Sequence, residues 1–157
     1  MIHQKLVLNA QLGFTSSYLI YGLGGIGKTQ VAIEYSYRHC NDFDVIYWLR
    51  ADDYETLLRS YFQLYEDPSF RGLTGLNLGD ENDLEKITAR VKLWFESCCD
   101  IRWLLVIDNA DKLQRDSISP GGQIKTIGNI IPRGQSECVL VTSRDRSALG
   151  QLATDGE

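Results

Sequence analysis

The stretch of sequence that decides the fold reads Gly22-Leu23-Gly24-Gly25-Ile26-Gly27-Lys28-Thr29. Four of its eight residues are glycines, and it ends in a lysine and a threonine. Glycine is favoured where the backbone needs a positive φ or where another group must approach the main chain closely. The spacing Gly-x-x-x-x-Gly-Lys-Thr therefore predicts a tightly curled loop that leads into a helix.

A loop of this kind is suited to binding phosphate. Main-chain N–H groups at a helix N-terminus can neutralise a polyphosphate without the burial of an equal number of charged side chains. Lys28 adds a positive charge for the β- and γ-phosphates, and Thr29 offers a hydroxyl ligand to Mg²⁺. The pattern thus predicts a P-loop that binds a nucleoside triphosphate. Its expected binding residues are Gly22, Gly24, Gly25, Ile26, Gly27, Lys28 and Thr29.

Apolar runs of strand length alternate with helical patterns along the chain. We expect strands at Ser17–Tyr21, Asp44–Arg50, Trp103–Ile107 and Glu137–Thr142. Helices are expected from Gly27–Lys28 to about His39, from about Tyr54 to Leu64 behind a cap at Asp52 or Asp53, at Thr126–Ile131, and near Arg146–Leu152. Strands that alternate with helices form parallel sheets with right-handed crossovers. The predicted fold class is therefore α/β, with a three-layer arrangement of a parallel sheet and helices on both faces.

One further helix is predicted by a stripe of apolar residues at helical spacing. The stripe consists of Leu84, Ile87, Val91, Trp94 and Cys98. The residues before it, Glu66–Asn82, are rich in Gly, Asp, Pro and Asn and are expected to form a loop.

An acidic residue ends the third expected strand. The apolar run Leu104-Leu105-Val106-Ile107 is followed by Asp108. Ligands of open α/β sheets bind at the C-terminal ends of the strands, so we expect the Asp108 carboxylate to hold Mg²⁺ together with Thr29. Asn109 comes next, and an amide can orient water but cannot accept its proton, so slow hydrolysis is expected. Asp108 and Asn109 are thus the expected catalytic residues, whereas Asp111 is interpreted as a loop or cap residue.

The last expected strand also ends in polar residues. Thr142, Ser143 and Arg144 follow the apolar run Val139-Leu140-Val141. The guanidinium of Arg144 is expected to reach the γ-phosphate, and the hydroxyl of Thr142 or Ser143 could hydrogen-bond it. The alternative for Arg144 is a surface ion pair with Asp145 or Asp111.

Length and composition restrict the class of function. The chain has 157 residues, which is enough for one domain, and a net charge of −5. A negative balance argues against a general nucleic-acid binder. No stretch approaches the roughly 20 apolar residues of a membrane helix, and no signal peptide is visible, so we expect a cytoplasmic protein that makes no membrane contact.

The cysteines and histidines carry no recognisable motif. Cys40, Cys98, Cys99 and Cys138 form no Cys-x-x-Cys pair, so they predict neither a zinc site nor a disulfide framework. His3 and His39 are isolated in the sequence, and neither is assigned a metal or catalytic role.

Together these segments resemble the NB-ARC family of nucleotide-binding switch domains, which belongs to the STAND group of P-loop ATPases found in NOD-like receptors. The matching segments are Gly22–Gln30 for its Walker A motif, Phe43–Ala51 for its second-strand signature, Leu104–Asp111 for its Walker B motif and Val139–Arg144 for its sensor strand. The residues of these motifs are most similar to those of the fungal branch of the family. The resemblance adds Gln30 to the nucleotide-binding residues and implies that Arg144 senses the γ-phosphate.

The resemblance also implies a function and a fold. Family members are regulatory switches of RecA/ASCE-like fold that hold ADP at rest and ATP when active, with Mg²⁺, and they signal through other domains or chains of a receptor-type assembly. An oligomer is compatible with this pattern. Two alternatives remain: a turnover ATPase, which Asn109 argues against, and a non-hydrolysing interaction module. At most a weak ATPase activity is expected.

Some family features are not found in this sequence. The Gly-x-Pro motif of the helical domain, the Met-His-Asp motif of the winged-helix domain and the last core strand are missing. We therefore expect a truncated or excerpted chain, with a lead-in at 1–16, a nucleotide-binding core at 17–152 and a tail at 153–157. Without the last strand, Ser17–Tyr21 is expected to lie at an unprotected edge of the sheet.

Overall fold

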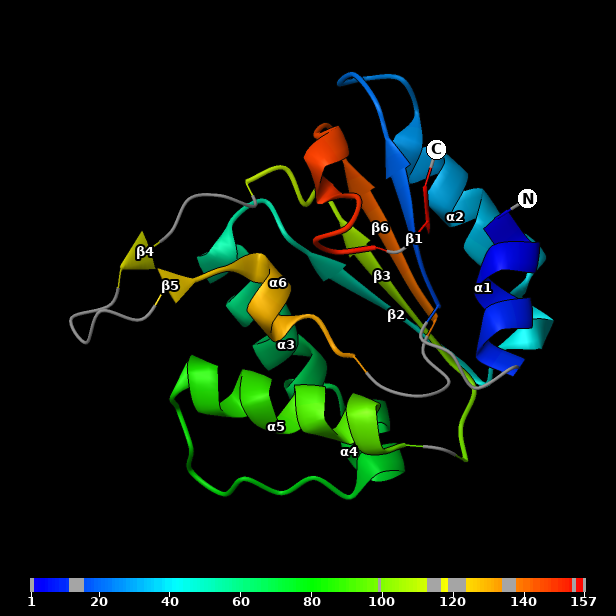
Figure 1. Ribbon diagram of the computed structural model, residues 1–157. Helices are drawn as coiled ribbons and strands as arrows, with labels where there is room; N and C mark the ends of the chain where they lie inside the picture. Colours follow the sequence, from blue (N-terminus) through cyan, green and yellow to red (C-terminus); the bar gives the residue numbers. More distant parts are fainter. Residues whose placement is uncertain are drawn as a thin grey trace.

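Five parallel strands form one sheet in the order β2-β3-β6-β1-β7 (Figure 1). The computed structural model describes residues 2–11, 16–98, 100–112, 117–118, 124–133, 138–153 and 155–156. The strands are β1 (Ser16–Tyr21), β2 (Val45–Arg50), β3 (Trp103–Asp108), β6 (Cys138–Ser143) and β7 (Asp155–Gly156). Two further short strands, β4 (Ser117–Ile118) and β5 (Ile124–Lys125), pair antiparallel outside this sheet.

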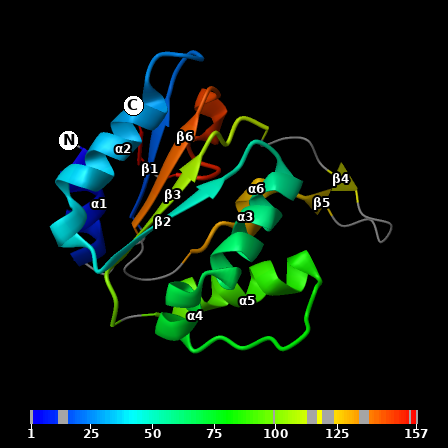
Figure 2. The same cartoon turned by 180° about the vertical axis from the view of Figure 1, so that it is seen from behind.

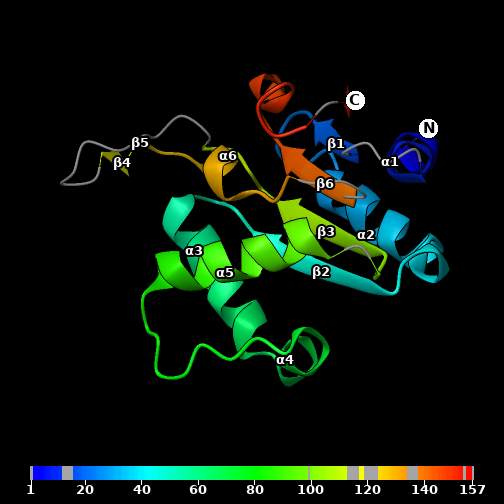
Figure 3. The same cartoon turned by 60° about the horizontal axis from the view of Figure 1, so that its bottom comes forward.

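Helices cover both faces of the sheet, so the predicted three-layer α/β class is confirmed. The helices α1 (Ile2–Gln11) and α2 (Lys28–Arg38) lie on one face, as Figure 2 shows from behind. The opposite face carries α3 (Tyr54–Glu66), α4 (Pro68–Thr74), α5 (Leu84–Ser97) and α6 (Ile127–Ile130). Figure 3 shows α3 and α5 packed side by side under the sheet.

The inner strand β3 explains why the sheet needs helices on both faces. Leu104 and Val106 point to the α1–α2 side and belong to one buried cluster. Leu105 and Ile107 point to the other side and join the cluster beneath α3 and α5. Because successive side chains of a strand alternate between faces, a continuous apolar run requires cover on both faces.

Most expected elements form close to their predicted bounds. All four expected strands are present, although Glu137 lies outside the described residues. Asp53, rather than Asp52, caps α3, because its side chain accepts a hydrogen bond from the Thr56 N–H. In α5 the apolar stripe is completed by Phe95, which is fully buried, while Cys98 forms the C-cap.

Four features differ from the expectations. The expected loop Glu66–Asn82 contains α4, which the Asp67 side chain caps at Ser69 and Phe70. The expected lead-in at 1–16 contains α1, which packs on β1 and β6. The helix expected near Arg146–Leu152 is shorter, a 3₁₀ turn η2 (Arg146–Ala148).

The fourth difference concerns the edge of the sheet beside β1. No strand was expected there, but β7 pairs with β1 opposite Tyr18 and Leu19. The expectation that Ser17–Tyr21 lies at a fully unprotected edge is therefore corrected. β7 is only two residues long, so it covers a small part of this edge.

Candidate phosphate-binding site

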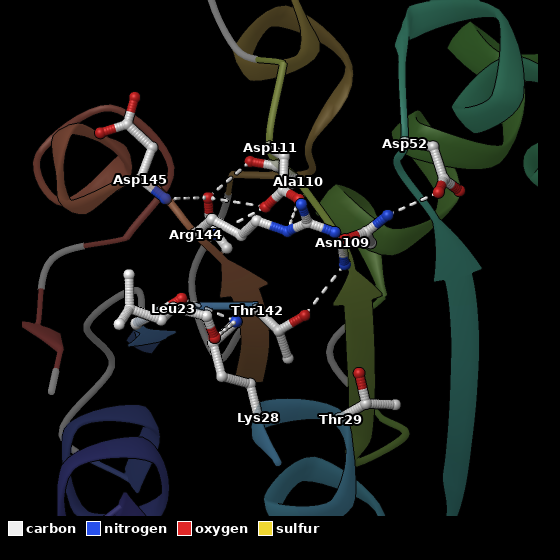
Figure 4. Close-up of polar contacts among 12 residues, drawn as sticks. Leu23, Lys28, Thr29, Asp52, Asn109, Ala110, Asp111, Thr142, Arg144 and Asp145 are labelled. Atoms are coloured by element: carbon white, nitrogen blue, oxygen red, sulfur yellow. Dashed lines mark hydrogen bonds and ion pairs between the residues drawn. The ribbon is translucent and has the colours of Figure 1, made fainter. Parts of the chain in front are cut away.

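The sheet brings the predicted site residues together at the C-terminal ends of its strands. β1, β3 and β6 are parallel neighbours, and the register pairs Tyr21 with Ser143. The segments that follow these strands therefore leave the sheet side by side (Figure 4). Gly22 is tied to this edge because its N–H donates to the Ser143 carbonyl at 3.2 Å.

The loop between β1 and α2 is curled as the sequence predicts. Gly25 has a φ of 79° and Gly27 a φ of 96°, which are backbone angles that other residues rarely adopt. Gly27 is the N-cap of α2, so the loop passes directly into the first turn of this helix. The first N–H groups of a helix lack partners within the helix, and its dipole favours an anion at that position.

Lys28 lies at the start of α2 with its ammonium group turned back over the loop. Its Nζ donates to the carbonyl oxygens of Gly22 at 2.7 Å and of Leu23 at 2.9 Å (Figure 4). The positive charge is thus held over the loop by main-chain oxygens. It makes no ion pair with any carboxylate among the described residues, so it is available for an anion.

Asp108 connects three elements of the site. Its Oδ1 accepts hydrogen bonds from Thr29 Oγ1 at 2.9 Å and from Thr142 Oγ1 at 2.6 Å. Thr142 is 1% exposed, so the carboxylate is held from inside the sheet and faces the first turn of α2. Thr29 and Asp108, the predicted metal ligands, therefore lie together.

The spacing of these two oxygens fits an octahedral cation. Adjacent ligands about 2.0–2.1 Å from Mg²⁺ lie roughly 2.9 Å apart. Thr29 Oγ1 and Asp108 Oδ1 have this separation, and both are the hard oxygen ligands that Mg²⁺ prefers. The residues present thus fit the cation that the sequence predicts.

Asn109 has an unusual backbone and a fixed side chain. Its φ is 65°, and among the described residues it is the only non-glycine residue with a positive φ. Its N–H donates to Thr142 Oγ1 at 2.9 Å, and its side-chain amide donates to Asp52 Oδ1. Figure 4 shows the amide turned toward Asp52, the residue that lies just beyond the end of β2.

Sequence reasoning missed Asp52 as part of this edge. Asp52 follows β2, and its carboxylate also pairs with Arg50 at 3.0 Å. The available signal was its position directly after a strand, where parallel sheets place their functional residues. Its adjacency to Asp53, which does cap α3, made a capping role equally plausible from sequence.

Arg144 lies between the loop and Asp111. The side-chain Nε of Arg144 is 3.0 Å from Asp111 Oδ2, and the main-chain N–H of Arg144 donates to Asp111 Oδ1 at 2.6 Å. The guanidinium also lies over Gly24, since a Cβ added there would be 3.5 Å from Arg144 Cζ. The ion pair with Asp111, considered as an alternative, therefore forms while the side chain remains beside the loop.

The remaining predicted residues differ in where their side chains lie. Ser143 Oγ donates to the Ala110 carbonyl at 2.8 Å, and Thr142 Oγ1 is engaged by Asp108, so neither hydroxyl is directed at the loop. Ile26 lies in the loop and is 66% exposed. Gln30, in the first turn of α2, lines a hollow between α1 and α2.

Comparison with known proteins shows a distant similarity. A protein of Hyaloscypha variabilis named "Nucleotide-binding leucine-rich repeat (NLR)-like protein" is 23% identical to the chain over 140 residues. The match covers 82% of this chain and 13% of that protein. No family model matches the chain. Within the described ranges, no helix combines the length and apolar character required to cross a membrane.

Proposed function

We propose that this chain is the nucleotide-binding core of an NB-ARC-type switch that binds ATP and ADP with Mg²⁺. The observation that carries the proposal is the curled loop Gly22–Thr29 at the N-terminus of α2, with Lys28 over it and Asp108 beside Thr29. Main-chain N–H groups and Lys28 would bind the phosphates, and bound Mg²⁺ would neutralise part of their charge. The similarity to an NLR-like protein supports the same class.

The position of Arg144 supports a switch. Asp111 holds the guanidinium beside Gly24, at the rim of the loop. A γ-phosphate can draw Arg144 away from Asp111, whereas ADP lacks this group. A nucleotide shifts a conformational equilibrium only through different affinities for the two states, and this exchange of partners would supply such a difference. In this proposal the chain acts in the cytoplasm with other domains or chains of a receptor-type assembly.

Slow hydrolysis is supported by Asn109. The residue after Asp108 is an amide, which cannot accept a proton from water, and its side chain is bound to Asp52. The second candidate, a turnover ATPase, is favoured by one observation: Asp52 places a carboxylate at the same sheet edge, and a carboxylate can act as a general base. Phosphate release distinguishes the two, because steady turnover near 1 s⁻¹, within the usual enzyme range, would support the ATPase.

The binding proposal is tested by calorimetry of the full chain with ADP and ATP in the presence of Mg²⁺. We expect Lys28→Ala to lose at least about tenfold in affinity, because it removes charge-assisted hydrogen bonds to phosphate. Lys86→Ala removes an exposed lysine that pairs with Glu81 at 3.4 Å, and it should bind like the wild type. Wild-type affinity in Lys28→Ala would refute the site.

A further inference from the structure

Two histidines that are 36 positions apart in the sequence lie stacked in the structure. His3 belongs to α1, and His39 is the C-cap of α2. Their ring centroids are 3.9 Å apart and the rings are inclined by 11°. The packing of α1 beside α2 (Figure 1) therefore joins two imidazoles that the sequence leaves unconnected.

A carboxylate lies beside both rings. Asp42, in the 3₁₀ turn η1 (Cys40–Asp42), has its Oδ2 3.0 Å from His39 Nδ1 and 3.9 Å from His3 Nε2. The three residues can each present a ligand atom such that all of these atoms lie within 4.8 Å of one another. A second partner orients His3, because its Nδ1 is 3.4 Å from the Tyr35 hydroxyl.

The cluster opens onto the surface. His3, Tyr35 and His39 line a hollow of about 640 Å³ between α1 and α2. The three candidate side chains are partly exposed, at 35% for His3, 28% for His39 and 43% for Asp42. An ion could therefore enter from solvent and keep water in its remaining coordination positions.

We propose that His3, His39 and Asp42 form a site for a divalent transition-metal ion of the zinc class. Two imidazoles and one carboxylate are a ligand set typical of zinc with an open position, whereas Mg²⁺ and Ca²⁺ prefer oxygen ligands alone. With metal on His3 Nε2, its Nδ1–H would donate to the Tyr35 oxygen, and a hydrogen bond at the second ring nitrogen orients a metal-bound histidine.

Metal binding requires the two imidazole rings to leave their stacked arrangement, because a ring nitrogen coordinates an ion in the plane of its own ring. Ligands at about 2.0–2.1 Å from a tetrahedral ion lie roughly 3.3 Å apart. His39 Nδ1 and Asp42 Oδ2 are already 3.0 Å apart, so the ring that must rotate and approach is that of His3, whose Nε2 lies 3.9 Å from Asp42 Oδ2. The ion would tie α1 to the C-terminal end of α2, the helix whose N-terminus carries the phosphate loop. The site does not depend on the proposed nucleotide function.

The test is titration of the tag-free full chain with Zn²⁺ by calorimetry, and with Co²⁺ by visible absorption. We expect one ion per chain and a Co²⁺ spectrum of low coordination number. His3→Ala, His39→Ala and Asp42→Asn should each weaken binding at least about tenfold. The matched control is Cys40→Ser, which removes an exposed thiol next to His39 and should change the affinity less than about twofold.

Two results would overturn the proposal. One is wild-type affinity in His39→Ala, which would mean that His3 and neighbouring groups bind the ion without α2. The other is loss of binding in Cys40→Ser, which would assign the ion to the thiol. Circular dichroism of each variant establishes that it is folded, and Asp42→Asn preserves side-chain size. Zn²⁺ should also raise the melting temperature of the wild type but not of His39→Ala, because an ion bound only by the folded chain stabilises it.

Discussion

Thr142 Oγ1 donates a hydrogen bond of 2.6 Å to Asp108 Oδ1, and this bond orients the carboxylate from inside the sheet. The same hydroxyl accepts the N–H of Asn109 at 2.9 Å, so one side chain on β6 fixes both the end of β3 and the residue after it. Asp108 thereby also accepts a hydrogen bond from Thr29 on α2. The geometry of the candidate site is therefore built into the strands.

Thr142→Val tests this relationship with a substitution of similar shape. The variant leaves the Asp108 carboxylate and the Asn109 N–H without a buried partner, so the free energy of unfolding should fall by about 1–3 kcal/mol. Urea unfolding followed by fluorescence measures this, and the Mg²⁺-dependent part of the nucleotide affinity should fall as well. Thr142→Ser keeps the hydroxyl and is the control. Equal stability of the valine and serine variants would contradict the prediction.

Arg144→Ala tests the proposed exchange between Asp111 and phosphate. If the guanidinium leaves Asp111 for a γ-phosphate, the variant should lose about tenfold in ATP affinity and much less in ADP affinity. The ratio of the two dissociation constants is the measurement. Arg59→Ala removes an exposed arginine that pairs with Glu55 on α3, and it should leave the ratio unchanged. Equal losses for ATP and ADP would rule out γ-phosphate sensing by Arg144.

Gly27→Ala tests the backbone of the loop. A φ of 96° is strained for alanine although no atom lies within 4 Å of the added Cβ, so the cost is conformational and should be about 1–3 kcal/mol. Gly72 in α4 has equally open space around it but no positive φ. Gly72→Ala should therefore stabilise the chain by about 0.5–1 kcal/mol. Thermal unfolding of both variants gives the comparison, and a shift of the same sign in both would contradict it.

The sequence predicted the sheet well because its signals are local. The run Trp103–Ile107 and the glycine spacing of 22–29 each specify one element with its bounds. Thr29 and Asp108 were also predicted together, since parallel strands deliver their C-terminal residues to one edge. The contact between Thr142 and Asp108 was not predicted, because it depends on the register between β3 and β6, which neither segment specifies alone.

The remaining differences arise from tertiary contacts. α1 has only a weakly amphipathic sequence, and the burial of Leu6 against β1 and β6 is what places it. The Asn109 amide donates to Asp52, and this contact depends on the pairing of β2 with β3. His3 and His39 are neighbours because α1 packs near α2. Their separation in the sequence gives no periodic signal that predicts this contact.

The N-terminal ends of the strands provide a prediction about how the stability of the chain depends on pH. Asp44, just before β2, receives hydrogen bonds from the Arg102 side chain at 2.7 Å and from the Arg102 N–H at 2.9 Å. These hydrogen bonds hold the pKa of the Asp44 carboxyl below its ordinary value of 3.8. Because the pKa is lower in the folded than in the unfolded chain, Asp44 stabilises the fold above pH 3.8, and this contribution is lost as the pH falls through the lowered value.

Asp44→Asn should therefore flatten the acid limb of the stability curve. The variant should be less stable than the wild type at pH 7, and the difference should shrink as the pH falls from 3.8 through the lowered pKa of the folded wild-type carboxyl. Urea unfolding across this range measures the effect. Arg102→Ala should flatten the curve in the same way, and the double variant should add little, because both substitutions remove the same interaction.

Nucleotide affinity at pH 7 should not change, since Asp44 lies at the N-terminal ends of the strands, away from the loop. A wild-type acid limb in Asp44→Asn would show that the Arg102 pair does not contribute to stability.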